Sequence, residues 1–160
     1  MIVGLARRFV YNEHCSQPIC KKAPGPPCGS PANAVSDKRY QFRIDVHSQY
    51  LPEQSKPDDG QYAFAYTIRI TNTGNVASQL ISRHWVIRDE TGRLIEVKGL
   101  GVVGHQPLLK PGESFEYTSG SQIATPTGAM HGSYFCVAED GHRFEVPIAE
   151  FALSMPRTLH

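Results

Sequence analysis

The residues best suited to chemistry form one glycine-rich motif. Gly99, Gly101 and Gly104 follow the spacing G-x-G-x-x-G, and His105 comes directly after them. In dinucleotide-binding folds, glycines at this spacing let the backbone approach a pyrophosphate at the N-terminus of the next helix. Two prolines in the segment that follows exclude a long helix there. The sequence therefore does not predict a Rossmann-type site.

Two interpretations of this motif stay open. In the structural one, the glycines permit a bend or bulge between two strands, and Leu100, Val102 and Val103 pack into the core. In the functional one, backbone N–H groups around the three glycines form a concave anion-binding nest, to which His105 or a neighbouring lysine adds positive charge. The ligand of such a nest would be an anion such as a pyrophosphate.

The cysteines do not predict a metal or catalytic site. Cys15, Cys20 and Cys28, together with His14, could supply soft ligands to zinc, but they lack the paired C-x-x-C spacing of such sites. Cys136 lies in a hydrophobic run. A nucleophilic thiolate needs an electropositive and partly exposed setting, so we expect Cys136 to be a reduced core thiol.

Other motifs for catalysis are lacking in the sequence. It contains no G-x-S-x-G elbow, no H-E-x-x-H pair and no P-loop. His84 and His131 could be neighbours on facing strands, but a solvated or hydrogen-bonded histidine is commoner than a ligand. We therefore expect a protein that is not an enzyme and that holds no metal or cofactor.

Charge and composition divide the chain into two unlike parts. The 160 residues have a formal net charge of +1, so no global field attracts nucleic acid. Residues 1–33 hold four basic residues and one acidic residue, a net +3, with five of the twelve prolines; residues 34–160 hold twelve and fourteen, a net −2. We expect residues 1–33 to be a disordered Pro/Cys-rich extension and residues 34–160 to be one folded domain.

The apolar runs are far shorter than the roughly 20 residues of a membrane-spanning helix. The N-terminal residues also do not resemble a secretory signal. We therefore expect a cytoplasmic protein that does not span a membrane.

Short alternating segments separated by turn residues predict an all-β fold. A penultimate strand carries Tyr134 two residues before Cys136, and Trp85 lies on an earlier strand, which is typical of an immunoglobulin-like or fibronectin type III-like antiparallel β-sandwich. The exposed edge strands of such a sheet could form a homodimer. The seven expected strands span residues 40–46, 62–70, 80–87, 94–97, 114–117, 130–138 and 144–148.

Several stretches, in order along the chain, resemble the ApaG family of small bacterial proteins. They are 62–68 (YAFAYTI), 83–85 (RHW), 99–104 (GLGVVG), 106–107 (QP), 109–113 (LKPGE), 117–120 (YTSG), 130–134 (MHGSY) and 156–160 (PRTLH). The resemblance implies a fibronectin type III or immunoglobulin-like sandwich in residues 34–160.

The resemblance implies less about activity. The family is linked to cobalt and magnesium tolerance or efflux, and its domain recurs in F-box proteins and in a polymerase-interacting protein. This implies a non-enzymatic module that binds another protein, with only an indirect effect on efflux. The alternative that the resemblance implies is a pyrophosphate- or nucleotide polyphosphate-binding protein that uses Gly99, Gly101, Gly104 and His105, with Mg²⁺ or Co²⁺ as a weakly bound companion.

Overall fold

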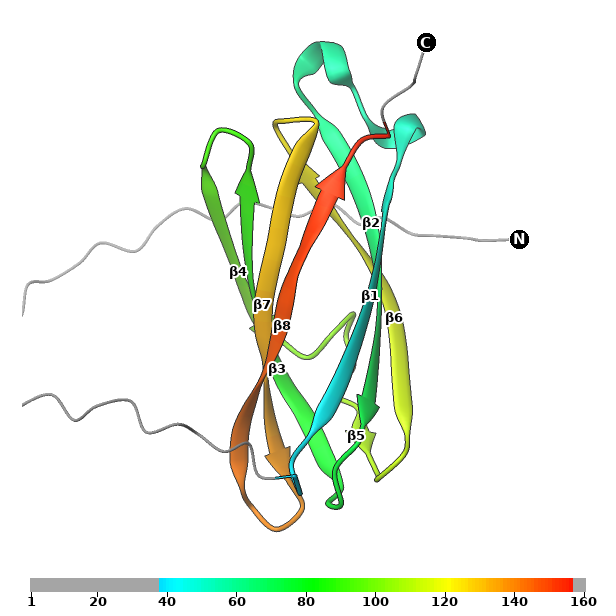
Figure 1. Cartoon of the computed structure of the whole chain (residues 1–160), viewed down its shortest axis with the longest axis vertical. Helices are drawn as coiled ribbons and strands as arrows, with labels where there is room; N and C mark the ends of the chain where they lie inside the picture. Colours follow the sequence, from blue (N-terminus) through cyan, green and yellow to red (C-terminus); the bar gives the residue numbers. More distant parts are fainter. Residues whose placement is uncertain (1–37, 157–160) are drawn as a thin grey trace, which may run out of the picture. The chain divides into compact units, whose positions relative to one another are not determined.

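Two antiparallel β-sheets lie face to face in the computed structural model, which describes residues 38–156 (Figure 1). The three-stranded sheet has the order β1-β2-β6, with β1 at Phe42–Tyr50, β2 at Tyr62–Asn72 and β6 at Ser114–Ile123. The expectations for residues 1–33 lie outside the described residues. The larger sheet has the order β4-β3-β7-β8: β4 is Leu94–Leu100, β3 is Ser78–Asp89, β7 is Thr127–Ala138 and β8 is Arg143–Ser154, and β5, Leu108–Leu109, pairs with one end of β3.

The core lies between the two sheets. Alternate residues of β2, from Phe64 to Ile70, point inward and are almost fully buried. Trp85 on β3 lies edge-on to Tyr66 across the sandwich and to Tyr134 on β7, with ring centroids 5.7 and 6.0 Å apart. Burial of each side chain of this size stabilises the fold by roughly 1.5–3 kcal/mol. The alternating apolar residues therefore favour two sheets that pack with their apolar faces together.

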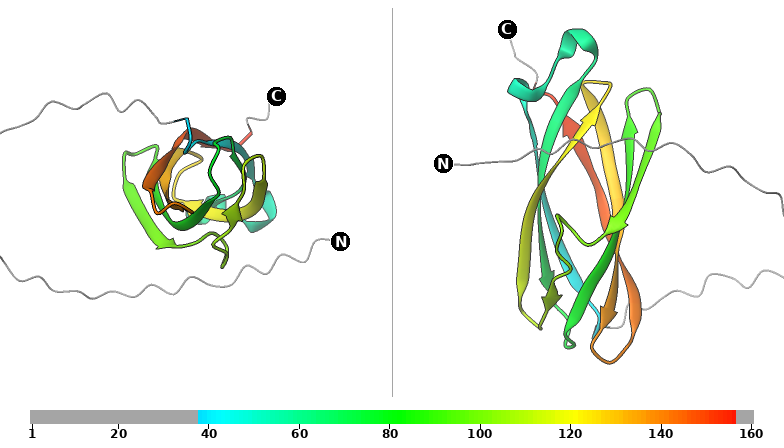
Figure 2. Two further views of the ribbon diagram at one scale, coloured as in Figure 1. Left: turned by 90° about the horizontal axis from the view of Figure 1, so that it is seen from below. Right: turned by 180° about the vertical axis from the view of Figure 1, so that it is seen from behind.

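The two long sides of the sandwich differ. On one side β8 lies beside β1, and the Ser48 hydroxyl donates a 2.8 Å hydrogen bond to the Ala152 carbonyl. On the other side β4 forms the outer edge of the larger sheet, and no strand among residues 38–156 pairs with that edge (Figures 1 and 2). The sandwich is thus closed along β1 and β8 and leaves the backbone of β4 accessible.

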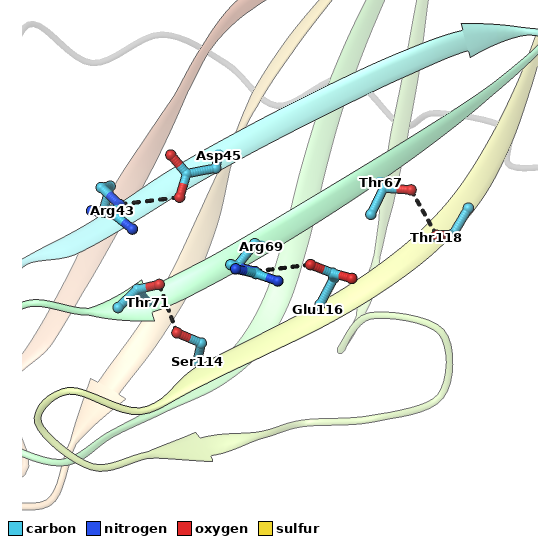
Figure 3. A network of polar contacts seen from close by, with 8 residues as sticks. All are labelled: Arg43, Asp45, Thr67, Arg69, Thr71, Ser114, Glu116 and Thr118. Atoms are coloured by element: carbon cyan, nitrogen blue, oxygen red, sulfur yellow. Dashed lines mark hydrogen bonds and ion pairs between the residues drawn. The ribbon is translucent and has the colours of Figure 1, made fainter.

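The prediction of an all-β sandwich is confirmed, and all seven expected strands are present. The short strand β5 was not predicted. β6 continues to Ile123, well past the expected end at residue 117. Ser119 and Ser121 interrupt the apolar pattern of its inward face, and pairing with β2 extends the strand. Polar side chains on its outward face also contact β2. Figure 3 shows these cross-strand contacts: Thr67 with Thr118 (2.8 Å), Thr71 with Ser114 (2.8 Å) and the Arg69–Glu116 ion pair (2.9 Å).

In the part of the chain that the structure describes, helical structure is confined to two short 3₁₀ turns in the polar loop between β1 and β2, Pro52–Gln54 (η1) and Pro57–Asp59 (η2). Within residues 38–156, no helix has the length and apolar character needed to cross a bilayer.

Candidate functional site

The second half of the glycine motif is a tight two-residue turn. Val102 and His105 form a bridge in which each N–H donates to the other's carbonyl, at 2.8 and 2.9 Å. The two residues between them, Val103 and Gly104, have positive φ angles of 48° and 80°. Positive φ at both central positions is the property of a type I′ turn, which matches the twist of a hairpin.

Each glycine of the motif has its own structural reason. A Cβ on Gly101 would lie 2.3 Å from the His105 carbonyl oxygen, and its φ is also positive, at 59°. Gly104 has open space around it but needs its left-handed φ. A Cβ on Gly99 would come 3.1 Å from Nη1 of Arg83. Backbone conformation at Gly101 and Gly104, together with the close approach of Arg83 to Gly99, is therefore sufficient to explain the G-x-G-x-x-G spacing.

Most backbone donors of the motif are already used. The Gly101 N–H donates to the Ile81 carbonyl at 2.8 Å. The Val102 N–H donates to the His105 carbonyl, and the His105 N–H donates to the Val102 carbonyl. Among residues 38–156, the N–H groups of Val103 and Gly104 have no acceptor. The turn thus offers an outside ligand two adjacent donors, fewer than a phosphate-cradling loop supplies.

A basic side chain that sequence reasoning did not select lies against this motif. Arg83 is in phase with buried Trp85 on β3, so its side chain points to the inner side of the larger sheet. Its Nη1 donates to the carbonyls of Leu100, at 3.1 Å, and Gly101, at 2.7 Å. The sequence carried one signal, the phase of Arg83 with Trp85, whereas its position opposite Gly99 depends on the β3–β4 register.

An open depression of about 490 Å³ adjoins Arg83. Glu96 offsets part of the positive charge around this depression, because the Glu96 Oε2 lies 3.5 Å from Nζ of Lys98 and 3.6 Å from Nε2 of His84. The structure does not gather the four predicted site residues here. Gly99 lines the depression, Gly101 is buried, and Gly104 and His105 are exposed on the turn. The complete lining is Ser82, Arg83, His84, Lys98, Gly99, Leu100 and Glu145.

Exposed apolar side chains gather in the same segment. Leu100, Val103 and Leu108 are 75, 56 and 54 % exposed. Together with Leu94 on β4, they are the large exposed hydrophobic residues of the described chain. The expectation that Leu100 and Val103 pack into the core is wrong, because Leu100 is in phase with the outward residues of β4 and Val103 lies at the turn tip; only Val102 is fully buried.

Comparison with known proteins identifies the family. Residues 52–138, more than half of the chain, match the ApaG domain. The chain belongs to the ApaG family. It is 69 % identical to Protein ApaG of Ralstonia nicotianae over 122 residues, which are 76 % of this chain and 98 % of that protein, and 62 % identical to Protein ApaG of Bordetella pertussis over 77 and 94 % of the two chains.

Solved structures agree with the fold of this ApaG-family chain. A crystal structure described as the ApaA protein of Bordetella pertussis is 61 % identical, with a TM-score of 0.73 over 76 % of this chain and 98 % of that one. The resemblance stated from the sequence motifs is therefore confirmed, and the sandwich with it.

The remaining candidate residues of this ApaG-family chain lie in the core or on an outer face. Cys136 is a free thiol, 1 % exposed, and burial raises its pKa to about 12, so the prediction of a reduced core thiol is confirmed. His84 and His131 are diagonal neighbours on β3 and β7, not residues of facing sheets. His131 Nδ1 lies 3.7 Å from Oε2 of Glu150. Within residues 38–156, no three potential ligands converge as a metal site.

Proposed function

We propose that this ApaG-family chain is a non-enzymatic, cytoplasmic binding module that engages another protein through the apolar side chains of Leu100, Val103 and Leu108, here called the loop surface. The observation that carries the proposal is their concentration: three of the four large exposed hydrophobic residues of the described chain lie between residues 100 and 108. Exposed apolar side chains that gather in this way mark interaction sites more often than scattered ones do.

The backbone at Val103 supports the same proposal. A β-branched residue with a φ of 48° is a strong outlier, and such a conformation costs on the order of 1–3 kcal/mol. The side chain does not recover this cost by packing, because it is more than half exposed. Glycine would satisfy the turn without strain, so the valine serves something other than the fold.

The chemistry available to the chain favours binding over catalysis. The only cysteine among residues 38–156 is buried with a raised pKa, which keeps its thiol protonated and unreactive at neutral pH. An effect on cobalt or magnesium tolerance would then be indirect and would arise through the bound protein.

The test is capture of a partner from cell extract by the immobilised full chain, followed by direct titration of the purified partner. The V103G variant removes the apolar side chain and keeps the turn conformation, whereas the matched control V103I keeps both the apolar character and the strain. We expect the wild type and V103I to bind the same protein and V103G to lose it. Absence of a reproducible partner at any salt concentration, or equal capture by V103G, would contradict the proposal.

The depression beside Gly99 supports a second candidate function, the binding of pyrophosphate or a nucleotide polyphosphate with Mg²⁺ or Co²⁺. The supporting observation is that His84 and Lys98, a directly opposed pair on the outward face of β3 and β4, line the depression beside that glycine. Calorimetric titration with pyrophosphate and with diadenosine tetraphosphate, each with and without Mg²⁺, tests it. Binding that K98A weakens and K110A does not would support this function, because Lys110 does not line the depression. No heat at millimolar ligand would exclude it.

A further inference from the structure

The outer edge of β4 presents a regular row of backbone groups to which no strand among residues 38–156 bonds. The Gly101 N–H donates to the Ile81 carbonyl, and at the other end of the ladder the Asp89 N–H donates to the Arg93 carbonyl. In an antiparallel pair, bonded and non-bonded residue pairs alternate. The odd-numbered residues of β4 therefore bond to β3, while Leu94, Glu96, Lys98 and Leu100 direct their N–H and C=O groups away from it.

The same four residues also share the outward face of β4. Leu94 and Leu100 are 62 and 75 % exposed, and the side chains of Glu96 and Lys98 are more than half exposed. The order of these side chains is apolar, acidic, basic, apolar. Leu94 and Leu100 are equally far from Val97 on its two sides, and so are the oppositely charged Glu96 and Lys98.

We propose that β4 pairs antiparallel with β4 of a second copy of this chain, about a two-fold axis at Val97. In this register, Glu96 lies opposite the partner's Lys98, and Leu94 lies opposite the partner's Leu100. Both members of each pair have their free backbone groups turned toward the other chain, so the two larger sheets become one continuous sheet.

The alternative registers are disfavoured by charge. An axis at Glu96 places two carboxylates opposite each other, and an axis at Lys98 places two ammonium groups opposite each other, which is destabilising. An axis at residue 95 or 99 places a charged side chain opposite a leucine. An axis between two residues would pair inward with outward side chains. The register about Val97 alone matches both charge and hydrophobicity.

The contacts within the protomer are compatible with this pairing. The Leu100 carbonyl already accepts a 3.1 Å hydrogen bond from Nη1 of Arg83, and its second lone pair is available to the partner. The contacts of Glu96 with Lys98 and His84 are 3.5 and 3.6 Å long and lie on an exposed face, so these side chains can turn toward the partner. Pairing through one strand buries less surface than a stable obligate dimer does, so the dimer is weak and concentration-dependent.

Sedimentation velocity of the full chain, in reductant at about 10 μM to 1 mM, tests the association. We expect a shift from monomer to dimer across this range. E96K and K98E each place like charges opposite each other in the homodimer, so each variant alone should associate at least about tenfold more weakly. A sample that stays monomeric at the highest concentration would overturn the proposal, as would single variants that associate like the wild type.

The register is tested by restoring the charge pairs. The double variant E96K/K98E exchanges both charges and should regain the dimer, and an equimolar mixture of E96K with K98E should form a heterodimer because each charge again meets its opposite. Amide exchange at residues 96 and 98 should slow with protein concentration, while exchange at residue 97 should not. Failure of both the double variant and the mixture would refute this register.

This inference does not rest on the function proposed for the loop surface. Leu100 belongs to both surfaces, so the variants that separate the two accounts are placed at other residues. V103G should dimerise like the wild type, and the charge variants should still capture the loop partner. If the proposed dimer is refuted, the protein-binding function of the loop surface is still tested by its own experiment, and the reverse also holds.

Discussion

The guanidinium group of Arg83 lies directly against Gly99, in the space where a β-carbon would come within 3.1 Å of Nη1. From this position the guanidinium donates to the carbonyls of Leu100 and Gly101. The first glycine of the motif thus makes room for an arginine of the neighbouring strand, and that arginine fixes the start of the loop.

We predict that Arg83 and Gly99 act as a coupled pair. R83A should lower the free energy of unfolding by about 1–3 kcal/mol, because two carbonyls lose a charged donor. G99A should destabilise the wild type by displacing the guanidinium group, yet be neutral or stabilising by about 0.5–1 kcal/mol in the R83A background, where alanine suits a strand better than glycine. Urea unfolding of the four proteins measures this, and simple additivity would contradict the coupling.

The two glycines of the turn should differ in their tolerance of alanine. At Gly104 only the positive φ opposes a side chain, so G104A should cost about 1–2 kcal/mol. G101A adds a 2.3 Å approach to the His105 carbonyl and should cost clearly more. Thermal unfolding compares the two variants. Equal stability of G101A and G104A would show that the backbone at Gly101 relaxes freely.

The hydrogen bond between the hydroxyls of Tyr117 and Tyr134, at 2.5 Å, joins the two sheets inside the core. Y117F leaves the Tyr134 hydroxyl buried without this partner and should cost about 1–3 kcal/mol. Y117F/Y134F removes both polar groups and should cost less than the sum of the single variants. Denaturant unfolding of the three variants measures these free energies. Losses of stability that simply add in the double variant would argue against a hydrogen bond shared by the two hydroxyls.

Cys136 should make the fold sensitive to alkali. Burial raises the thiol pKa from 9.0 to about 12, so between these values the unfolded state releases a proton that the folded state keeps. The stability contributed by the neutral thiol is therefore complete below pH 9 and declines as pH rises toward 12, by up to about 1.4 kcal/mol per pH unit.

The control for this pH dependence is C136A. This variant should be less stable at neutral pH, because it leaves a small cavity, and its stability should fall less steeply between pH 8 and 10. Above pH 10 the buried tyrosines also contribute, since desolvation raises the pKa of Tyr66, Tyr117 and Tyr134. An unchanged slope in C136A would show that the thiol is not responsible.

The strands were predictable wherever one face is apolar and the other is polar, as in residues 62–70. The second half of β6 was not, because Ser119 and Ser121 interrupt the apolar pattern and the strand is held by its pairing with β2. β5 was missed for a related reason. It has two residues, and its pairing with Ser78 and Gln79 depends on the path of the preceding loop.

The glycine motif was located correctly from its spacing, but the directions of its N–H and C=O groups depend on tertiary structure. No local pattern shows that Gly101 donates to Ile81 or that Arg83 reaches under the motif. The exposure of Leu100 did have a local signal, because it continues the outward phase of Glu96 and Lys98 along β4. Applying that phase to the whole strand identifies the edge that we propose to self-associate.

The most direct test of the proposed function compares V103G, V103I and the wild type in two measurements on the same samples, affinity for the captured partner and free energy of unfolding. If Val103 serves binding and not folding, V103G is at least as stable as the wild type and binds at least about tenfold more weakly, while V103I binds like the wild type. Unchanged affinity of V103G, or a large loss of its stability, would contradict this account.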